Sequence, residues 1–122
     1  VYENAQVYGN AWVSGNAQVY GDAWVYGNAQ VSEDAQVNGN VRVYGYAKVC
    51  GGSWNKSPLQ IQGTKRFFNV SDSDSLQIGC MNFSIAYWKE HFRKIGMQQG
   101  YSEQEIEEYK LYIDLAEKII KL

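Results

Sequence analysis

The sequence predicts a mainly β protein in which a parallel β-solenoid over residues 1–54 is followed by a small α+β tail over residues 55–122. Val recurs at every sixth position from Val1 to Val49 without interruption. A small or apolar residue stands two positions before each later Val, and Gly commonly stands two positions after it. This period stops at residues 55–58, which include the only proline of the chain.

Each six-residue repeat predicts one short strand and one bend. Side chains alternate along a strand, so Val and the small residue before it share one face, and the residues flanking Val lie on the other. The Gly-Asn and Gly-Asp pairs allow the backbone angles of a tight corner. One such strand cannot bury its own Val, so successive turns are expected to stack around a continuous core.

The repeated phrase, as in GNAQVYGDAWVYGNAQV at residues 15–31, resembles the hexapeptide-repeat family. The resemblance covers residues 1–54 and implies a left-handed parallel β-helix in which three repeats complete one triangular coil. Residues 1–54 would then form about three coils. The handedness comes from the resemblance alone, because the general rule for parallel crossovers favours the right-handed form.

With three repeats in each coil, outward side chains fall into columns. One predicted face is aromatic and carries Tyr8, Tyr26 and Tyr44 beside Trp24 and Arg42. The other two faces are mostly polar. Stacked tyrosines can shield the sheet, but a contiguous exposed aromatic surface is also typical of a ligand or partner interface. Both interpretations stay open, and these five residues are candidate binding residues.

The tail is expected to contain three strands and two helices. Alternating apolar residues predict strands over residues 59–62, 66–70 and 76–80. Apolar residues at helical spacing from Ile85 to Ile95 predict a helix that ends at Gly96 or Gly100. Ser102 and Glu105 then form the pattern of a capping box, which predicts the start of a second helix.

The last predicted helix carries a narrow apolar seam at spacings of three and four residues, formed by Ile106, Tyr109, Ile113, Ala116 and Ile120. A solenoid that ends abruptly exposes apolar side chains and unpaired strand edges. We therefore expect the tail to cap the solenoid and to join subunits, with the seam as the candidate oligomerisation surface. Its partner is either a helix of the same chain or one of a neighbouring protomer.

The tail is similar to the ends of uncharacterised hexapeptide-repeat proteins of phages and prophages, in its IQG turn, its IGC segment and its GYSEQEIEEYKLYI helix. That resemblance implies a phage-derived protein that acts in the host cytoplasm, in counter-defence. In the resembling proteins a His often stands three residues after the Cys of IGC. Phe83 occupies that position here, so shared Cys-His chemistry is not expected.

The sequence offers little for catalysis. Acyltransferases of the hexapeptide-repeat family work as trimers with a histidine base near the coils, but the only histidine here is His91, in the first tail helix. His91 with Cys50 and Cys80 cannot complete a tetrahedral metal site within one chain, and no cofactor is expected. The two cysteines, without CxxC spacing, favour a reducing cytoplasm.

The net charge argues against nucleic acid and membranes as partners, whereas local positive charge suggests a phosphorylated ligand. A net charge of -2 gives no general attraction to nucleic acid or anionic membranes. No apolar run approaches the ~20 residues that span a bilayer, and no leader is recognised at the start. Locally, Lys65, Arg66, Lys89 and Arg93 are candidate ligand contacts, because cations opposite tyrosines suit a planar, phosphorylated molecule.

These observations favour a non-catalytic, oligomeric binding protein, with a trimer favoured by the family resemblance. Its role would be to block a host protein or to sequester a nucleotide-type signal. Two alternatives from other classes stay open: an acyltransferase-like enzyme, and a structural module of a phage spike or tip.

Overall fold

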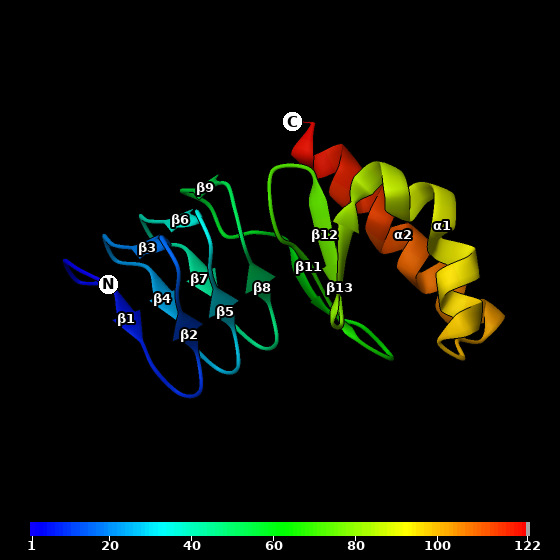
Figure 1. Ribbon diagram of the computed structural model, residues 1–122, viewed down its shortest axis with the longest axis horizontal. Helices are drawn as coiled ribbons and strands as arrows, with labels where there is room; N and C mark the ends of the chain where they lie inside the picture. Colours follow the sequence, from blue (N-terminus) through cyan, green and yellow to red (C-terminus); the bar gives the residue numbers. More distant parts are fainter. Residues whose placement is uncertain (122) are drawn as a thin grey trace.

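The computed structural model describes residues 1–121, which form an elongated molecule with a stack of short strands at the N-terminal end and two helices at the other (Figure 1). Nine strands of two residues each make up the N-terminal part. Their bounds are β1 Gln6–Val7, β2 Trp12–Val13, β3 Gln18–Val19, β4 Trp24–Val25, β5 Gln30–Val31, β6 Gln36–Val37, β7 Arg42–Val43, β8 Lys48–Val49 and β9 Ser53–Trp54.

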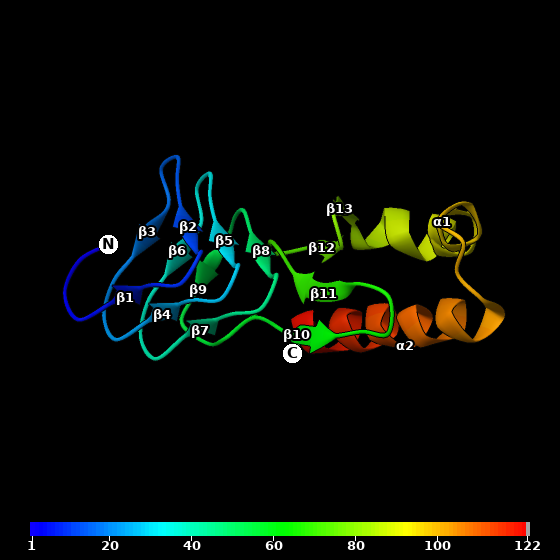
Figure 2. The same cartoon turned by 90° about the horizontal axis from the view of Figure 1, so that it is seen from below.

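These strands form three parallel sheets, in the orders β1-β4-β7, β2-β5-β8 and β3-β6-β9. Each strand therefore pairs with the third strand along the chain, as when Gln6 lies opposite Trp24 and Val7 opposite Val25. The three sheets enclose a common interior (Figure 2). The predicted parallel β-solenoid is confirmed.

The valines fill this interior, as their six-residue period predicts. Val25, Val31, Val37 and Val43 are all fully buried, and the alanines between them pack into the same core. Glycine is needed at the corners because successive turns touch there. A Cβ added to Gly27, whose φ is +68°, would lie 3.0 Å from the backbone nitrogen of the next turn.

The tail contains a four-stranded antiparallel sheet in the order β10-β11-β12-β13, followed by two helices. Their bounds are β10 Gln60–Gln62, β11 Phe67–Val70, β12 Ser75–Ile78, β13 Met81–Ser84, α1 Ile85–Gln98 and α2 Glu103–Ile120. The three predicted strands are present, but β13 was not predicted. Its four residues run directly into α1, so no turn residue separates the strand from the helix in the sequence.

The structure decides which of the two predicted glycines, Gly96 or Gly100, follows the end of α1. Gly96 does not end the helix but lies buried inside it, where an added Cβ would be 2.8 Å from Cγ1 of Ile106. The chain instead turns at Gly100, whose φ is +79°. The predicted capping box of Ser102 and Glu105 is present at the start of α2.

No helix among residues 1–121 combines the length and the apolar character that crossing a membrane requires.

The apolar seam of α2 packs within its own chain. Ile106, Tyr109, Ile113 and Ala116 are at most 3% exposed. Tyr109, Ile113 and Ala116 join a second core with residues of the sheet and α1, and Ile106 lies against Gly96 of α1. Ile120 is partly buried against the same core. Of the two partners considered for the seam, the structure shows the intrachain one, because α2 needs this face to cover the tail sheet. These five residues therefore offer no seam to a second copy.

Side-chain amides of the tail complete the last turn of the solenoid. The Oε1 atom of Gln60 accepts from the Tyr44 N–H at 2.9 Å, and its Nε2 donates to the Arg42 carbonyl at 2.8 Å. Asn69, which is fully buried, accepts from the Lys48 N–H at 3.1 Å and donates to the Lys48 carbonyl at 2.9 Å. Each amide thus replaces the peptide group that another turn would supply.

An aromatic ring and a backbone carbonyl complete this cap. Phe67 is 7% exposed and belongs to the solenoid core rather than to the tail core. A Cβ added to Gly45 would lie 2.6 Å from the Phe67 ring, so only glycine leaves room for the ring there. On another face, the carbonyl of Ser71 accepts from the Cys50 N–H at 2.9 Å. The tail thereby covers both the polar edge and the apolar interior of the last turn.

Replacing Asn69 with Ala is expected to lower the free energy of unfolding by about 2–4 kcal/mol, because a buried donor and acceptor of the last turn lose their partner. Urea denaturation followed by circular dichroism measures the loss. Asn40→Ala is the control, because Asn40 is exposed at a solenoid corner and should change stability little. Equal stability of the two variants would show that the amide of Asn69 does not hold the cap.

Candidate functional site

The structure divides the predicted binding residues into three separate groups. Tyr8, Trp24, Tyr26, Arg42 and Tyr44 lie along the sheet β1-β4-β7. Lys65 and Arg66 lie in the turn between β10 and β11, next to the last turn of the solenoid. Lys89 and Arg93 lie on α1. The predicted binding residues therefore do not form one site.

The aromatic column is present, but it is occupied by its own members. The Tyr26 ring stacks on Tyr8 at 5.3 Å and on Tyr44 at 5.9 Å between ring centroids. The Arg42 guanidinium lies 4.1 Å from the centre of the Trp24 ring and donates to three backbone carbonyls nearby. A flat ligand finds both faces of the central ring covered, so these contacts favour the shielding interpretation.

Lys89 and Arg93 are engaged in ion pairs between the two helices. The Lys89 ammonium lies 3.0 Å from the carboxylate of Glu117, whose pKa this hydrogen bond lowers. Arg93 contacts Glu103 and Glu107, each at 3.0 Å, and hydrogen bonds to these two carboxylates raise its pKa. Both cations thus join α1 to α2, and the prediction that they bind a ligand finds no support in the structure.

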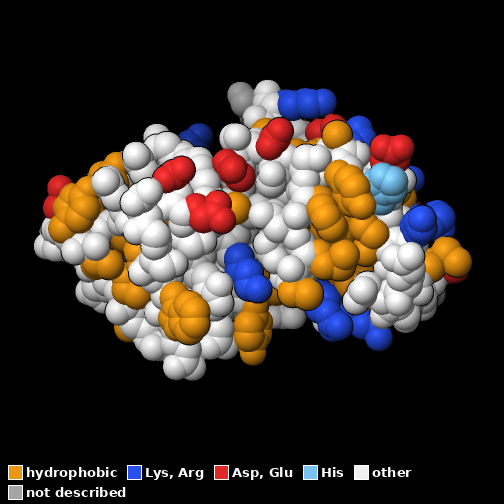
Figure 3. All heavy atoms as spheres, in the orientation of Figure 1, with side chains coloured by type: hydrophobic (Ala, Val, Ile, Leu, Met, Phe, Trp, Pro, Cys, Tyr) orange, Lys and Arg blue, Asp and Glu red, His pale blue; other side chains and the backbone are white. Residues whose placement is uncertain are grey.

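Lys65 and Arg66 line a surface hollow of about 300 Å³ where the solenoid meets the tail. Its lining residues are Tyr46, Lys48, Gln62, Lys65, Arg66, Phe67 and Gly79. The set contains three cations and no carboxylate, and within residues 1–121 none of these cations forms an ion pair. Figure 3 shows basic and hydrophobic side chains together at the lower part of this junction, with acidic ones above them.

Two residues of this junction hollow, Tyr46 and Lys48, were not predicted, although the repeat contains a signal for both. Tyr46 stands at the corner position that Asn occupies in most other repeats. Lys48 continues the strand column that begins with Trp12 and Gln30. The last repeat therefore departs from the repeated phrase at the two positions that face the hollow. A comparison of the repeats with one another could have identified them.

Helix α2 fixes the turn that carries the other two cations. The Tyr109 hydroxyl accepts from the backbone N–H groups of Lys65 and Arg66 at 3.1 and 2.6 Å, and it donates to the Arg66 carbonyl at 2.7 Å. The Glu108 carboxylate accepts from the Thr64 N–H at 2.8 Å. The turn is thus held by four hydrogen bonds from one helix.

The protonation states of Tyr109 and Glu108 suit their hydrogen bonds to the turn. Burial raises the pKa of Tyr109, so its hydroxyl keeps the proton that it donates. Partial burial alone would raise the pKa of Glu108, but hydrogen bonds from Thr64 and Tyr112 outweigh this effect and lower it below its usual value. Glu108 therefore stays ionised at neutral pH and accepts from the turn.

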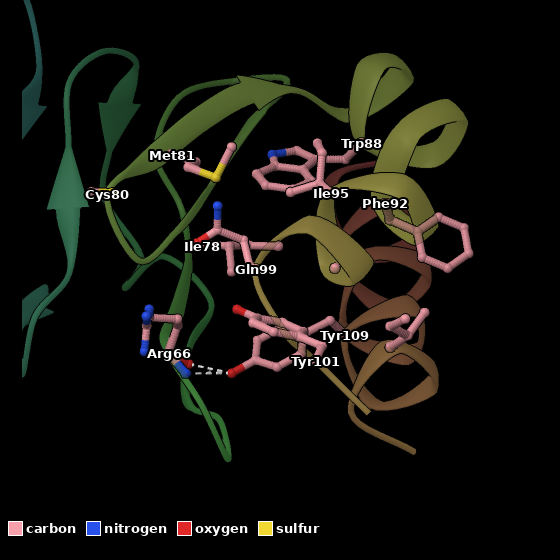
Figure 4. A pocket seen from close by; sticks show the side chains of 12 residues that line it. Arg66, Ile78, Cys80, Met81, Trp88, Phe92, Ile95, Gln99, Tyr101 and Tyr109 are labelled. Atoms are coloured by element: carbon pink, nitrogen blue, oxygen red, sulfur yellow. Dashed lines mark hydrogen bonds between the residues drawn. The ribbon is translucent and has the colours of Figure 1, made fainter. Parts of the chain in front are cut away.

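A second pocket lies inside the tail, between the sheet and both helices, and Figure 4 shows it from close by. Arg66 stands at its edge, and apolar side chains such as Trp88 and Ile95 form its walls. Its enclosed volume is about 30 Å³, the share of one water molecule. Burial raises the pKa of Tyr101, in its wall, to about 12. This pocket is too small for an organic ligand.

The cysteines and the histidine form no recognisable catalytic group. The half-buried Cys50 thiol lies 3.4 Å from the Asn82 amide, and burial raises its pKa, which disfavours the reactive thiolate. Cys80 is exposed, and the His91 ring packs on Tyr87 at 4.2 Å. In the part of the chain that the structure describes, no group of three or more His, Cys, Asp or Glu side chains could hold a metal ion.

Comparison with known families identifies the repeat. The family model described as the YdcK beta solenoid repeat matches residues 5–18 and residues 17–33. The repeat is of the β-solenoid type. The match covers β1 to β5 and ends before the last turn of the solenoid, where the junction hollow lies. Comparisons with curated proteins and with solved structures give no significant match.

Replacing Tyr26 with Ala is expected to lower the free energy of unfolding by about 1–2 kcal/mol, because two ring contacts are lost at once. Thermal and urea denaturation measure the change. Tyr26→Phe keeps the stacked ring and should retain most of the stability, so it is the matched control. If Tyr26→Ala is as stable as the parent chain, the column does not shield the sheet.

Proposed function

We propose that this chain is a non-catalytic binding protein that holds a small anionic ligand in the junction hollow. The observation that carries the proposal is the grouping of Lys48, Lys65 and Arg66 around a concave surface without a carboxylate. Such a grouping is unfavourable by itself, because like charges repel. It becomes favourable when an anion lies between the cations.

The three cations offer complementary contacts for phosphate. Lysine binds phosphate as a compact point charge, whereas arginine offers paired N–H donors that match two phosphate oxygens. Lys48 projects from the solenoid, while Lys65 and Arg66 come from the tail. Both parts of the chain are therefore needed for the site, which gives the tail a role in binding beyond closing the solenoid.

The backbone at the site is held in place before a ligand arrives. Lys48 lies on β8, and its N–H and C=O groups are both bonded to the buried amide of Asn69. The turn of Lys65 and Arg66 is bonded to α2 through Tyr109. A site with a fixed backbone loses less conformational entropy on binding, which favours affinity for a small ligand.

We base the proposed biological role on the family resemblances of the repeat and of the tail. The repeat of residues 1–54 supports a left-handed parallel β-helix of the hexapeptide-repeat kind, and the tail motifs support a phage-derived protein in the host cytoplasm. In that setting the chain would sequester a nucleotide-type signal in counter-defence. A concave cationic hollow favours a small anion over the alternative of blocking a host protein, which would use a flatter surface.

Inorganic pyrophosphate tests the anion site. We expect it to bind with an affinity that falls as salt is raised, because the contacts are mainly electrostatic. Replacing Lys65 and Arg66 together with Ala should weaken binding about tenfold or more, since hydrogen bonds to charged groups contribute about 1.5–3 kcal/mol each. Isothermal titration calorimetry measures both effects.

Lys94→Ala is the control for this experiment, because Lys94 is an exposed cation of α1 that does not line the hollow. It should bind pyrophosphate like the parent chain. The proposal fails if pyrophosphate does not bind, or if the double variant and the control bind it equally well.

We also propose that the chain assembles with copies of itself, as the family resemblance implies. The predicted seam on α2 is buried within one chain, so assembly would use other surfaces. Light scattering coupled to size-exclusion chromatography gives the molar mass in solution. We expect a multiple of the 13.9 kDa chain mass, with a trimer favoured, and the mass of a single chain at high concentration would contradict self-assembly.

A further inference from the structure

We infer that the ligand of the junction hollow is a phosphorylated compound with a planar ring, of the nucleotide class, and that Tyr46 stacks on the ring while the cations hold the phosphate. This inference rests on the proposed function, because it names the ligand of the same site. It assigns a role to Tyr46 that the anion site alone does not need.

Tyr46 is the ring that the hollow offers to a ligand. It is 59% exposed, and no other ring of residues 1–121 stacks on it or meets its edge. Phe67, the other ring in the lining, is buried in the solenoid core. The tyrosines of the column, by contrast, stack on one another. An unpartnered aromatic face beside three cations suits a ligand that is flat at one end and anionic at the other.

The position of Tyr46 in the repeat explains why its ring stays free. Asn10 and Asn28 occupy the same corner of the two preceding turns, and an asparagine there offers no ring on which Tyr46 could stack. Beyond the last turn the chain leaves the solenoid for the tail. Phe67, the aromatic residue on that side, packs over Gly45 into the solenoid core, so no ring stacks on Tyr46.

Size and polarity agree with this class of ligand. The hollow of about 300 Å³ lies at the lower end of the range for small-molecule sites, about 300–1,000 Å³. Gln62 adds an amide to the lining, and its Nε2 donates to the Gly63 carbonyl at 3.3 Å. The Oε1 atom of Gln62 has no hydrogen-bond donor within residues 1–121, so it can accept from an amino group on the edge of a ring.

The test compares AMP with ribose 5-phosphate, which has the same phosphate and sugar but no ring. We expect AMP to bind about tenfold more tightly to the parent chain, the effect of stacking one base on an aromatic side chain. Tyr46→Ala should remove this difference and leave the affinity for ribose 5-phosphate unchanged. Tyr46→Phe keeps the ring and should retain the preference for AMP.

Trp12→Ala is the matched control, because Trp12 is an equally exposed aromatic residue of the solenoid at 65% but does not line the hollow. It should bind AMP like the parent chain. Circular dichroism and urea denaturation of each variant verify that the fold is intact. Tyr46 and Trp12 are both exposed, so neither substitution removes a core contact.

The outcomes separate this inference from the proposed function. If ribose 5-phosphate and AMP bind equally well, and Tyr46→Ala changes neither affinity, the ring is not recognised. The inference is then overturned together with the nucleotide-type signal proposed above, while the anion site stands. If none of AMP, ribose 5-phosphate and pyrophosphate binds, the proposed function fails, and the inference fails with it.

Discussion

The structure depends on how the last turn of the solenoid is closed. Each turn satisfies its backbone N–H and C=O groups by pairing with the next, so the final turn presents polar groups and an apolar interior that nothing in the repeat can cover. Gln60 and Asn69 supply amide groups in place of another strand, and Phe67 fills the end of the core. This requirement forces the tail to lie directly on the solenoid.

Closing the solenoid also creates the candidate site. Asn69 pairs with the backbone of Lys48, so the amide that completes the last turn also fixes a residue of the hollow. Tyr109 does the same for the turn of Lys65 and Arg66, which it reaches from the second helix. The hollow is thus a consequence of two rigid parts meeting. Its cations come from both parts, Lys48 from the solenoid and Lys65 and Arg66 from the tail.

Tyrosines lie in different surroundings in the aromatic column and in the junction hollow. Tyr8, Tyr26 and Tyr44 stand at the same position of successive turns, so their rings meet and cover one another. Tyr46 follows Asn10 and Asn28 in its column, and no ring of residues 1–121 stacks on it. Aromatic content alone therefore does not mark a binding surface. In the proposed site the ring offered to the ligand is the one that no ring of its own chain covers.

The sequence by itself determined the parallel solenoid, its buried valines and the aromatic column, because a six-residue period repeats the same local environment at every turn. It also predicted the capping box of α2 and included Lys65 and Arg66 among its candidates. Only the tertiary structure decided that the α2 seam is internal, that Arg93 is paired with glutamates, and that Tyr46 and Lys48 join Lys65 and Arg66. These contacts join segments without a shared period, so no local pattern encodes them.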